Sequence, residues 1–234
     1  MVAKYDDGNY EINESYRAIR TFIAVDESLK TILVTSAEMD EGKTTAVSNI
    51  ARCFSELEDK RTLLVDCDFR KKGVNKQFGL EKESLGLTDI IYKGKDLDEC
   101  IIKYDNLDVL TCGTVHCNPS VLLEMERTKN FIESLKEKYD YIFIDSPPVM
   151  RVNDACIISQ YVDGTVIISA SKETDKHQVK VTKERLEKVN AKIIGVVLNK
   201  FKSNVSKVYS YYSYGDYEDM KKSKFKFFKR RKIK

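Results

Sequence analysis

A run of residues suited to binding phosphate follows an apolar stretch near the N-terminus. Residues 37–45 read AEMDEGKTT, in which Gly42, Lys43 and Thr44 complete a GxxxxGK(S/T) spacing. Such a loop points backbone N–H groups at phosphate oxygens, its lysine adds a mobile positive charge, and its threonine hydroxyl can bind Mg²⁺. Ala37 replaces the first glycine, which is acceptable if that position requires a small residue rather than a positive φ angle. The run predicts an ATP site formed by Ala37, Glu38, Met39, Asp40, Glu41, Gly42, Lys43, Thr44 and Thr45.

Two further apolar runs end in carboxylates. YIFIDSPP places Asp145 after four mostly apolar residues, and LLVDCDFR carries Asp66 and Asp68, followed by Arg70. Beside a phosphate loop, Thr44, Asp66 and Asp145 are the candidate ligands of Mg²⁺. A set such as Asp66, Asp68 and Arg70 can orient a nucleophile and balance charge, whereas hydrolysis alone needs one carboxylate to aim water. Each motif alone is also compatible with an ordinary polar strand end, so the nucleotide interpretation depends on their combination.

These side chains need strands and helices that bring them together. Short β-branched runs alternate with helical stretches, a pattern typical of buried parallel strands. The expected strands are 31–36, 62–66, 107–112, 141–145, 164–170 and 192–199, and the clearest helices are 44–58, 118–138 and 174–189. Alternating strands and helices predict right-handed crossovers and a layered α/β/α domain with a mostly parallel central sheet. Together with the phosphate loop, this predicts a P-loop NTPase fold. Asp145, at the carboxyl edge of its strand, would then face the phosphate loop.

The 234 residues fit one large domain or two small ones, and with 42% apolar residues the chain can bury a real core. One α/β domain is the simpler expectation. Six cysteines occur without a CxxC pair, and the N-terminus lacks the apolar core of a signal peptide, which together predict a reducing cytosol. Cys112, His116 and Cys117 supply at most three close ligands, too few for a structural zinc site. No run approaches the about 18 to 20 apolar residues that cross a bilayer.

Positive charge is concentrated at the C-terminus. Residues 221–234 read KKSKFKFFKRRKIK, with nine Lys or Arg, which leaves 31 basic and 37 acidic side chains in residues 1–220. Phenylalanines among lysines can enter a lipid interface while the cations meet anionic headgroups, so we expect contact with an anionic membrane surface. A solvated, disordered end is the alternative. The acidic remainder offers no second basic surface, so no nucleic-acid partner is expected.

A tyrosine cluster precedes this basic segment. Residues 209–217 read YSYYSYGDY, whose tyrosines match neither strand alternation nor helical spacing. Serine, glycine and aspartate supply turn chemistry between them, which indicates a presented tail. A low-complexity linker is the alternative. The tyrosines are Tyr209, Tyr211, Tyr212, Tyr214 and Tyr217.

Together, AEMDEGKTT, LLVDCDFR and IFIDSPP resemble the bacterial tyrosine kinases (BY-kinases) that control capsule and exopolysaccharide synthesis. The resemblance covers most of the chain and includes ESYRAIR, CNPSVLLEMERTKNFIESLKEKYDYIFID and a C-terminal tyrosine cluster. Cys117 stands where the family usually has a proline before Asn-Pro-Ser, which leaves the conformation of that loop open. In the family, the ExxRxxR helix serves ring assembly, so Glu14, Arg17 and Arg20 are expected at a subunit interface.

The resemblance implies a protein-tyrosine kinase that uses ATP and Mg²⁺. Lys43 would neutralise charge, Asp66 would accept or guide the phenolic proton, Asp68 and Asp145 would complete the surroundings of the metal, and Asn199 would read adenine. The tyrosine cluster would be phosphorylated in trans, which would separate assembled subunits and regulate polysaccharide synthesis and export.

The resemblance also implies partners. Family members without a transmembrane segment work with a separate membrane protein whose cytoplasmic tail activates them. We therefore expect a cytoplasmic kinase that is peripheral at the inner face of the plasma membrane through such an activator, and that also acts on other tyrosine-containing proteins. The expected division is a self-associating helix in residues 1–30, a kinase domain in 31–202 and a tail in 203–234.

Two other functions fit parts of the sequence. A partitioning or division-site ATPase of the related deviant-Walker class carries a signature lysine early in the phosphate loop, but that position is Glu38, whose charge would repel phosphate. A non-catalytic adaptor would need ATP only to stabilise its fold. The presence of Lys43, Asp66 and Asp145 argues against the adaptor.

Overall fold

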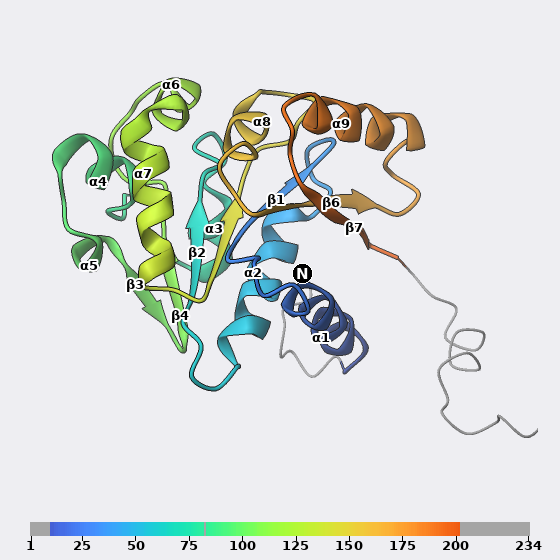
Figure 1. Cartoon of the computed structure of the whole chain (residues 1–234), viewed down its shortest axis with the longest axis horizontal. Coiled ribbons are helices and arrows are strands. Elements are labelled where there is room, and N and C mark those ends of the chain that lie inside the picture. The colour runs from blue at the N-terminus through green and yellow to red at the C-terminus, as the bar shows by residue number, and fades with distance from the viewer. Residues whose placement is uncertain (1–9, 82, 202–234) are drawn as a thin grey trace, which may run out of the picture. The chain divides into compact units, whose positions relative to one another are not determined.

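The computed structural model describes residues 10–81 and 83–201 of the chain (Figure 1). Two units divide between Lys200 and Phe201, and the elements below belong to the first. The tyrosine cluster and the basic segment 221–234 lie outside the described residues. The expected division of the chain at residues 30 and 202 stays a prediction.

Seven strands form one sheet in the described part of the chain. They are β1 Thr31–Ser36, β2 Thr62–Asp66, β3 Ile102–Tyr104, β4 Leu107–Leu110, β5 Tyr141–Asp145, β6 Gly164–Ala170 and β7 Ile193–Asn199. Their order is β3-β4-β2-β5-β1-β6-β7. The β3–β4 pair is antiparallel and the other five pairs are parallel. The predicted fold class, a P-loop NTPase fold with a mostly parallel sheet, is confirmed.

Burial explains why the central strands read as continuous apolar runs. Every residue of β1, β2, β4 and β6 is buried, because helices cover both faces of a parallel sheet. The edge strand β7 is covered less completely, and Val196 and Leu198 are each about half exposed. The sequence pattern of the inner strands therefore reflects their position between two helical layers.

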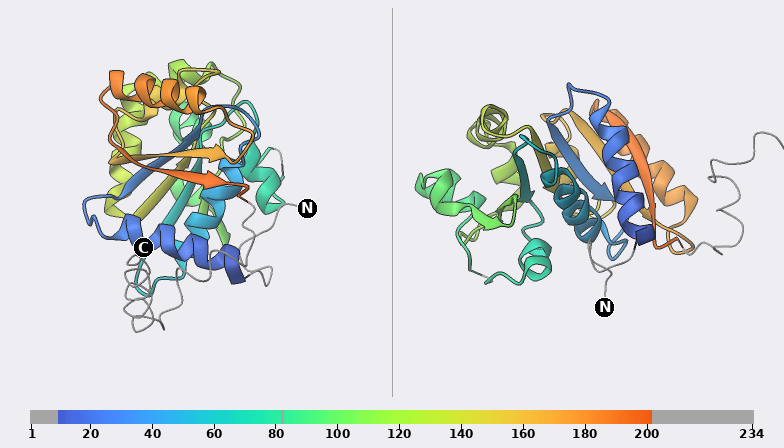
Figure 2. Two further views of the ribbon diagram at one scale, coloured as in Figure 1. Left: turned by 90° about the vertical axis from the view of Figure 1, so that its right-hand side faces the viewer. Right: turned by 90° about the horizontal axis from the view of Figure 1, so that it is seen from below.

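Helices of unequal length connect the strands. They are α1 Tyr10–Ala24, α2 Lys43–Ser55, α3 Gly73–Phe78, α4 Leu87–Lys93, α5 Leu97–Cys100, α6 Pro119–Glu124, α7 Glu126–Ser134, the 3-10 helix η1 Leu135–Glu137, α8 Asp154–Ile158 and α9 Lys176–Lys188. Residues of α1, α2 and α3 pack into one core cluster, whereas α4 to α9 contribute to the other. α1 and α9 lie on opposite sides of the sheet (Figure 2, left).

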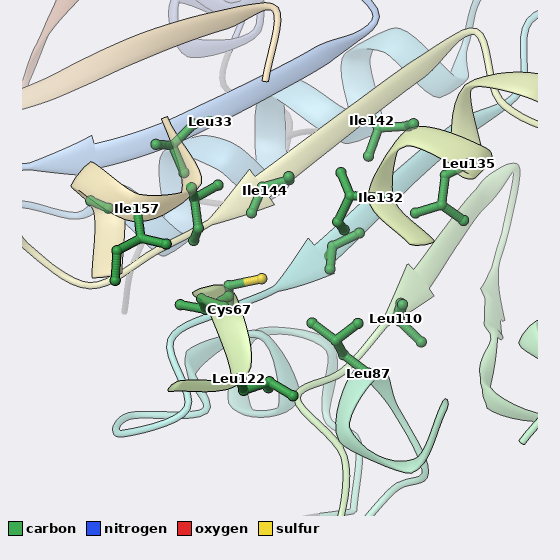
Figure 3. Packing of buried hydrophobic residues seen from close by; sticks show 14 of the residues in the cluster. Leu33, Cys67, Leu87, Leu110, Leu122, Ile132, Leu135, Ile142, Ile144 and Ile157 are labelled. Atoms are coloured by element: carbon green, nitrogen blue, oxygen red, sulfur yellow. The ribbon is translucent and has the colours of Figure 1, made fainter. Parts of the chain in front are cut away.

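The larger core lies between the sheet and the helices α4 to α9. Figure 3 shows Leu33, Ile142 and Ile144 of the strands facing Leu122 and Ile132 of the helices. All five side chains are fully or almost fully buried. This packing fixes the strands whose carboxyl ends carry the candidate catalytic residues.

Three local expectations differ from the structure. The helix expected over 118–138 is interrupted at Met125, whose extended backbone (φ −62°, ψ 132°) separates α6 from α7. The Thr128 hydroxyl donates to the Leu122 carbonyl oxygen at 2.6 Å across this break.

The strand expected over 107–112 ends at Leu110, and β3 precedes it as a short antiparallel edge strand. The short helices α3, α4, α5 and α8 were not predicted, because too few turns are present to establish a periodic pattern.

Asp89 holds the turn that follows β4. Its carboxylate accepts hydrogen bonds from the backbone N–H of Gly86 and of Thr114 and from the Thr114 hydroxyl, and Lys93 Nζ lies 2.8 Å from it. Burial alone would raise the pKa of Asp89, but the bonds from Lys93, Thr114 and Gly86 outweigh it and lower the pKa to about 2. The ionised side chain therefore stabilises the fold.

We expect Asp89→Asn to lower the free energy of unfolding by about 1–2 kcal/mol at pH 7. The expected loss is modest because solvent screens the charge of the half-exposed Lys93. A folded pKa below the unfolded value gives stability that is present above about pH 4. This stability is lost as the pH falls through about 2, so the gap between wild type and variant should narrow at pH 3. Urea unfolding at both pH values measures it, with the exposed Glu99→Gln as control. An equal gap at both pH values would contradict the role of charge.

Candidate active site

The phosphate loop leads directly into an uncapped helix. α2 begins at Lys43, and Gly42 at its N-cap has φ 82° and provides no side-chain cap. The first N–H groups of an α-helix have no acceptor within the helix. They are therefore available to an anion, and the positive end of the helix dipole favours negative charge there.

The backbone of the loop agrees with its residue types. Asp40 and Gly42 have positive φ angles, of 63° and 82°. Ala37 is fully buried and its φ angle is not positive, so this position needs a small residue rather than a glycine. The departure from the usual first glycine therefore leaves the loop conformation intact.

Side chains from two other segments brace the loop. The buried Glu41 carboxylate accepts from the backbone N–H of Glu38 at 2.8 Å and from the Thr174 hydroxyl. The Asn199 side-chain amide, at the end of β7, donates to the Glu41 carbonyl oxygen at 2.9 Å. Glu41 thus ties the loop to the segment after β6 and to the end of β7.

Lys43 is the charged centre of the site. Its ammonium group is buried and lies 2.8 Å from Asp68 Oδ2 and 3.4 Å from Asp145 Oδ1. Burial by itself lowers the pKa of Lys43, but the charges of Asp145, Asp68 and Asp66 outweigh it and raise the pKa above its usual value. Lys43 therefore stays protonated and forms ion pairs with both Asp68 and Asp145.

Asp66 and Asp145 occupy matching positions on neighbouring strands. β2 and β5 pair in parallel with Asp66 opposite Asp145, and both side chains are fully buried. Burial and the nearby charge of Asp145 raise the pKa of Asp66 to about 8, and burial also raises the pKa of Asp145. Asp66 accepts hydrogen bonds from the N–H groups of Asp68 and Val74. The site therefore holds more carboxylate than its buried cation can neutralise.

The oxygen donors at this edge suit Mg²⁺. The Thr44 hydroxyl donates to Asp145 Oδ2 at 2.6 Å, which places two hard oxygen ligands side by side. Within residues 10–81 and 83–201, no group of three or more His, Cys, Asp or Glu side chains is arranged to hold a metal ion. Mg²⁺ is usually bound through one or two carboxylates together with substrate phosphates and water. Thr44 and Asp145 fit that role.

The segment after β2 lies against the phosphate loop. Lys71 Nζ is 2.6 Å from Asp40 Oδ1, and a Cβ atom at Gly73 would come within 3.0 Å of the Thr44 side chain. Lys72 Nζ donates to the Gly113 carbonyl oxygen at 3.0 Å. Residues 68–73 therefore form one wall of the site, and we refer to them as the β2–α3 loop.

The structure gathers most of the predicted site residues. The fully buried Asp66 lies beside Asp68, which contacts Lys43, and Thr44 bonds Asp145. Glu38 turns its carboxylate to Arg151 Nε at 2.7 Å. The remaining predicted members, Met39, Asp40, Thr45 and Asn199, belong to the loop, to the start of α2 or to the end of β7. Their roles in binding nucleotide and metal stay predictions.

Glu14, Arg17 and Arg20 lie on α1, apart from the nucleotide site. Glu14 and Arg17 form an exposed 2.6 Å ion pair within the helix. Arg20 Nη1 donates to the Cys53 carbonyl oxygen at 2.6 Å, which attaches α1 to the C-terminal part of α2 in the same chain. Their expected place at a subunit interface stays a prediction.

Several residues that shape the site have no signal in the sequence. Thr174 and Arg151 contact Glu41 and Glu38, but both lie in loops after strands, where no motif marks them. Asp154 is fully buried and contacts Arg70, although 83 residues separate them in the chain. Only the fold brings such pairs together, so spacing along the chain could not identify them.

Comparisons with known proteins identify the family. The family model described as an AAA domain matches residues 29–200. The chain is 35% identical over 204 residues to tyrosine-protein kinase YwqD of Bacillus subtilis, a match that covers 85% of each chain. It is 38% identical over 201 residues to tyrosine-protein kinase CpsD of Streptococcus pneumoniae, covering 85% of this chain and 88% of CpsD. The chain belongs to the bacterial tyrosine kinase family.

Solved structures agree with membership in the bacterial tyrosine kinase family. The crystal structure of the chimerical protein CapA2B2 matches with a TM-score of 0.79 and 33% identity, over 85% of this chain and 88% of that one. The septum site-determining protein MinD of Pyrococcus horikoshii, solved with Mg-ADP, matches with a TM-score of 0.61 and 22% identity, over 73% and 70%. The likeness to MinD shows a shared fold alone.

In the part of the chain that the structure describes, no helix is both long enough and apolar enough to cross a bilayer.

We expect Gly42→Ala to destabilise the site by more than the backbone strain that alanine causes at a positive φ angle. The added Cβ would lie 2.3 Å from Asn199 Nδ2, which must then leave its bond to Glu41. Gly79→Ala is the matched control, because Gly79 also has a positive φ angle but open space around it. Gly79→Ala should cost about 1–2 kcal/mol of stability, whereas Gly42→Ala should cost more and weaken ATP binding at least about tenfold.

Thermal unfolding with and without ATP, together with a binding titration, measures both effects. The double variant Gly42→Ala/Asn199→Ala should recover part of the stability lost in Gly42→Ala. Equal melting temperatures and equal ATP affinities for the two glycine variants would contradict the proposed contact.

Proposed function

We propose that this chain is an ATP-dependent protein-tyrosine kinase that phosphorylates its C-terminal tyrosines in trans and regulates capsular or exopolysaccharide synthesis and export. The observation that carries the proposal is the buried Lys43 between Asp68 and Asp145, at the start of an uncapped helix. Family membership supports the tyrosine specificity, because the matched relatives are named tyrosine-protein kinases.

ATP binding replaces one set of charges around Lys43 by another. In the structure the ammonium group is neutralised by Asp68 and Asp145. Phosphate oxygens at the start of α2 would attract Lys43, so its contacts to the carboxylates would weaken as it turns to the nucleotide. Mg²⁺ bound with ATP neutralises charge on the transferred phosphoryl group. Thr44 and Asp145 are the side chains that would hold the metal.

Asp66 is the proposed acceptor of the phenolic proton. A free phenol has a pKa near 10, so a base assists attack at neutral pH. Burial raises the pKa of Asp66 to about 8, so its carboxyl group holds a proton at neutral pH. Asp66 can serve as base once added positive charge near it favours loss of that proton, and it is then a stronger base than an exposed aspartate. Because Asp66 is fully buried, neighbouring side chains must move for a tyrosine hydroxyl to reach it.

The tyrosine cluster in residues 209–217 is the proposed acceptor and switch. Closely spaced tyrosines in a polar segment suit a neighbouring active site, and each phosphate adds about −1.5 to −2 charge at neutral pH. Several phosphates would weaken packing between subunits, so unmodified protomers would assemble and modified ones separate. Glu14, Arg17 and Arg20 are the proposed contacts in that ring.

A transmembrane protein of the polysaccharide chain-length type is the proposed activator. It would keep this kinase in the cytoplasm at the inner face of the plasma membrane, where other tyrosine-containing proteins are further substrates. The family of the matched relatives supports this arrangement.

A deviant-Walker partitioning or division-site ATPase is the alternative function. Glu38 occupies the position of the signature lysine of that class, and its carboxylate is engaged by Arg151 at 2.7 Å. An acid at that position cannot supply the positive charge that a lysine brings to phosphate. This contact favours the kinase, and the likeness to MinD adds only a shared fold.

We expect Asp66→Asn to abolish tyrosine phosphorylation while nucleotide affinity changes less than about threefold, because the amide keeps the volume but cannot accept a proton. The full-length chain is incubated with ATP and Mg²⁺, and the modified residues are mapped by mass spectrometry. The wild type should carry phosphate within residues 209–217. Asp108→Asn, at the opposite edge of the sheet, is the matched control for loss of a buried carboxylate.

Two outcomes would contradict the proposal. Undiminished phosphorylation by Asp66→Asn removes the role of Asp66 as base. Phosphate on serine alone, or none in residues 209–217 of the wild type, removes the proposed acceptor.

We expect deletion of residues 221–234 to abolish sedimentation with anionic liposomes. Nine basic residues, at about 1 kcal/mol each near an anionic surface, suffice for reversible contact. Phosphorylation of the tyrosines upstream should weaken binding by offsetting this charge. Replacement of Phe225, Phe227 and Phe228 by serine is the matched variant that keeps every charge. Binding that is unchanged by the deletion, or by phosphorylation, would contradict the proposed electrostatic switch.

A further inference from the structure

Asp154 is a buried carboxylate to which the proposed phosphoryl transfer assigns no role. It is the first residue of α8 and is fully buried. Its Oδ1 accepts the Ser120 hydroxyl at 2.7 Å, and its Oδ2 accepts Arg70 Nη2 at 3.3 Å. Ser120 lies in the first turn of α6, whereas Arg70 lies in the β2–α3 loop. One carboxylate therefore joins three segments that are distant in sequence.

The Asp154–Arg70 pair constrains Arg70 more than a surface ion pair would. A buried ionised carboxylate is costly unless a cation and hydrogen bonds compensate it. Within the described ranges 10–81 and 83–201, Arg70 supplies the cation that contacts Asp154. The Arg70 side chain is itself 46% exposed, and Nη2 is the one nitrogen of its guanidinium with a hydrogen-bond partner in those ranges. Asp154 thus fixes one end of a guanidinium whose other N–H groups remain available.

Arg70 lies on the wall of the phosphate site. The N–H groups of Lys71 and Lys72 both donate to the Asp68 carbonyl oxygen, so Arg70 is part of a tight turn that begins at the residue contacting Lys43. The same turn is attached to the phosphate loop by the 2.6 Å contact of Lys71 with Asp40. Close packing of Gly73 on Thr44 fixes its far end.

The segment that carries Asp154 also follows the phosphate loop. After β5 ends at Asp145, the Val149 and Met150 N–H groups donate to the carbonyl oxygens of Ser36 and Ala37. Asp154 therefore begins its helix just beyond a stretch that is bonded to the loop. Arg70 and Asp154 therefore both lie in segments that are bonded to the phosphate loop. Their contact has a fixed position relative to a phosphate bound at that loop.

We propose that Asp154 and Ser120 are positioning residues that hold Arg70 so that its unbonded N–H groups bind oxygens of the phosphoryl group during transfer to tyrosine. The inference rests on the proposed function. In that step the tyrosine oxygen bonds to the γ-phosphorus, the bond from phosphorus to the departing ADP oxygen breaks, and the phenolic proton passes to Asp66. Arg70 forms no covalent bond and stabilises the charge on the phosphoryl oxygens.

A structural role for the pair gives a different expectation. If Arg70 only neutralised Asp154, then removing both charges would restore stability and activity together, since neither charge would remain unpaired. If Arg70 acts on the phosphoryl group, removing both charges restores stability alone. The double variant therefore separates the two roles.

The test compares Arg70→Ala, Asp154→Asn and the double variant Arg70→Ala/Asp154→Asn in the full-length chain. We measure kcat and KM for ATP in tyrosine phosphorylation, affinity for a fluorescent ADP analogue, and melting temperature. Each single variant should lower kcat by about 10- to 100-fold with ADP affinity within about threefold. Arg70→Ala should also lower the melting temperature, and the double variant should recover the melting temperature but not kcat.

Two further variants sharpen the comparison. Ser120→Ala removes one of the two hydrogen bonds that orient Asp154 and should lower kcat less than Asp154→Asn does. Asp108→Asn is the matched control, because Asp108 is also a nearly buried carboxylate bonded to a hydroxyl, that of Tyr139, and to a cation, Lys103. It should lower the melting temperature without the selective fall in kcat.

The outcomes distinguish this inference from the proposed function. A double variant with wild-type kcat, or an Asp154→Asn variant as active as wild type, overturns the positioning role while the kinase assignment stands. A fall in ADP affinity parallel to kcat also overturns it, because that pattern indicates general damage to the site. A wild type that forms no phosphotyrosine overturns the proposed function itself.

Discussion

One buried ammonium group sets the charge balance of the whole site. Lys43 contacts Asp68 and Asp145, and Asp66 lies opposite Asp145 on the neighbouring strand. Three carboxylates around one cation cannot all be neutralised, and burial together with the charge of Asp145 raises the pKa of Asp66. Such a cluster is stable only with further positive charge or protons. The site is thus electrostatically suited to a ligand that brings its own cation, as ATP with Mg²⁺ does.

The sheet order explains how these groups meet. β5 lies between β1 and β2, so the phosphate loop after β1 and the carboxylates after β2 and β5 reach one edge. Parallel pairing puts the carboxyl ends of β1, β2 and β5 on the same side, and burial on both faces fixes the register. A slip of one residue would turn Asp66 away from Asp145. The large cores on both faces of the sheet fix this register and therefore keep Asp66 opposite Asp145.

The strands, the fold class and the members of the charged cluster could be predicted from sequence because each has a local signal. β-branched runs mark strands, and GKT marks a phosphate loop. The contacts that brace the site could not be predicted from sequence, because Thr174, Arg151 and Asp154 reach the site from segments far along the chain. The break at Met125 was also hidden, because apolar spacing continues through it and only the backbone turns extended. The spacing of apolar residues indicates which side chains are buried, but it does not indicate where a helix is interrupted.

The acidic character of the phosphate loop illustrates why contacts decide function. AEMDEGKTT places three acids beside a site for anions, an arrangement that would repel phosphate if the side chains were free. The structure engages each acid elsewhere: Glu38 with Arg151, Asp40 with Lys71, and Glu41 with Thr174 and the Glu38 N–H group. Each acid thus has a partner of its own, and the same contacts tie the loop to three neighbouring segments. The acids therefore order the loop around the N–H groups that phosphate requires.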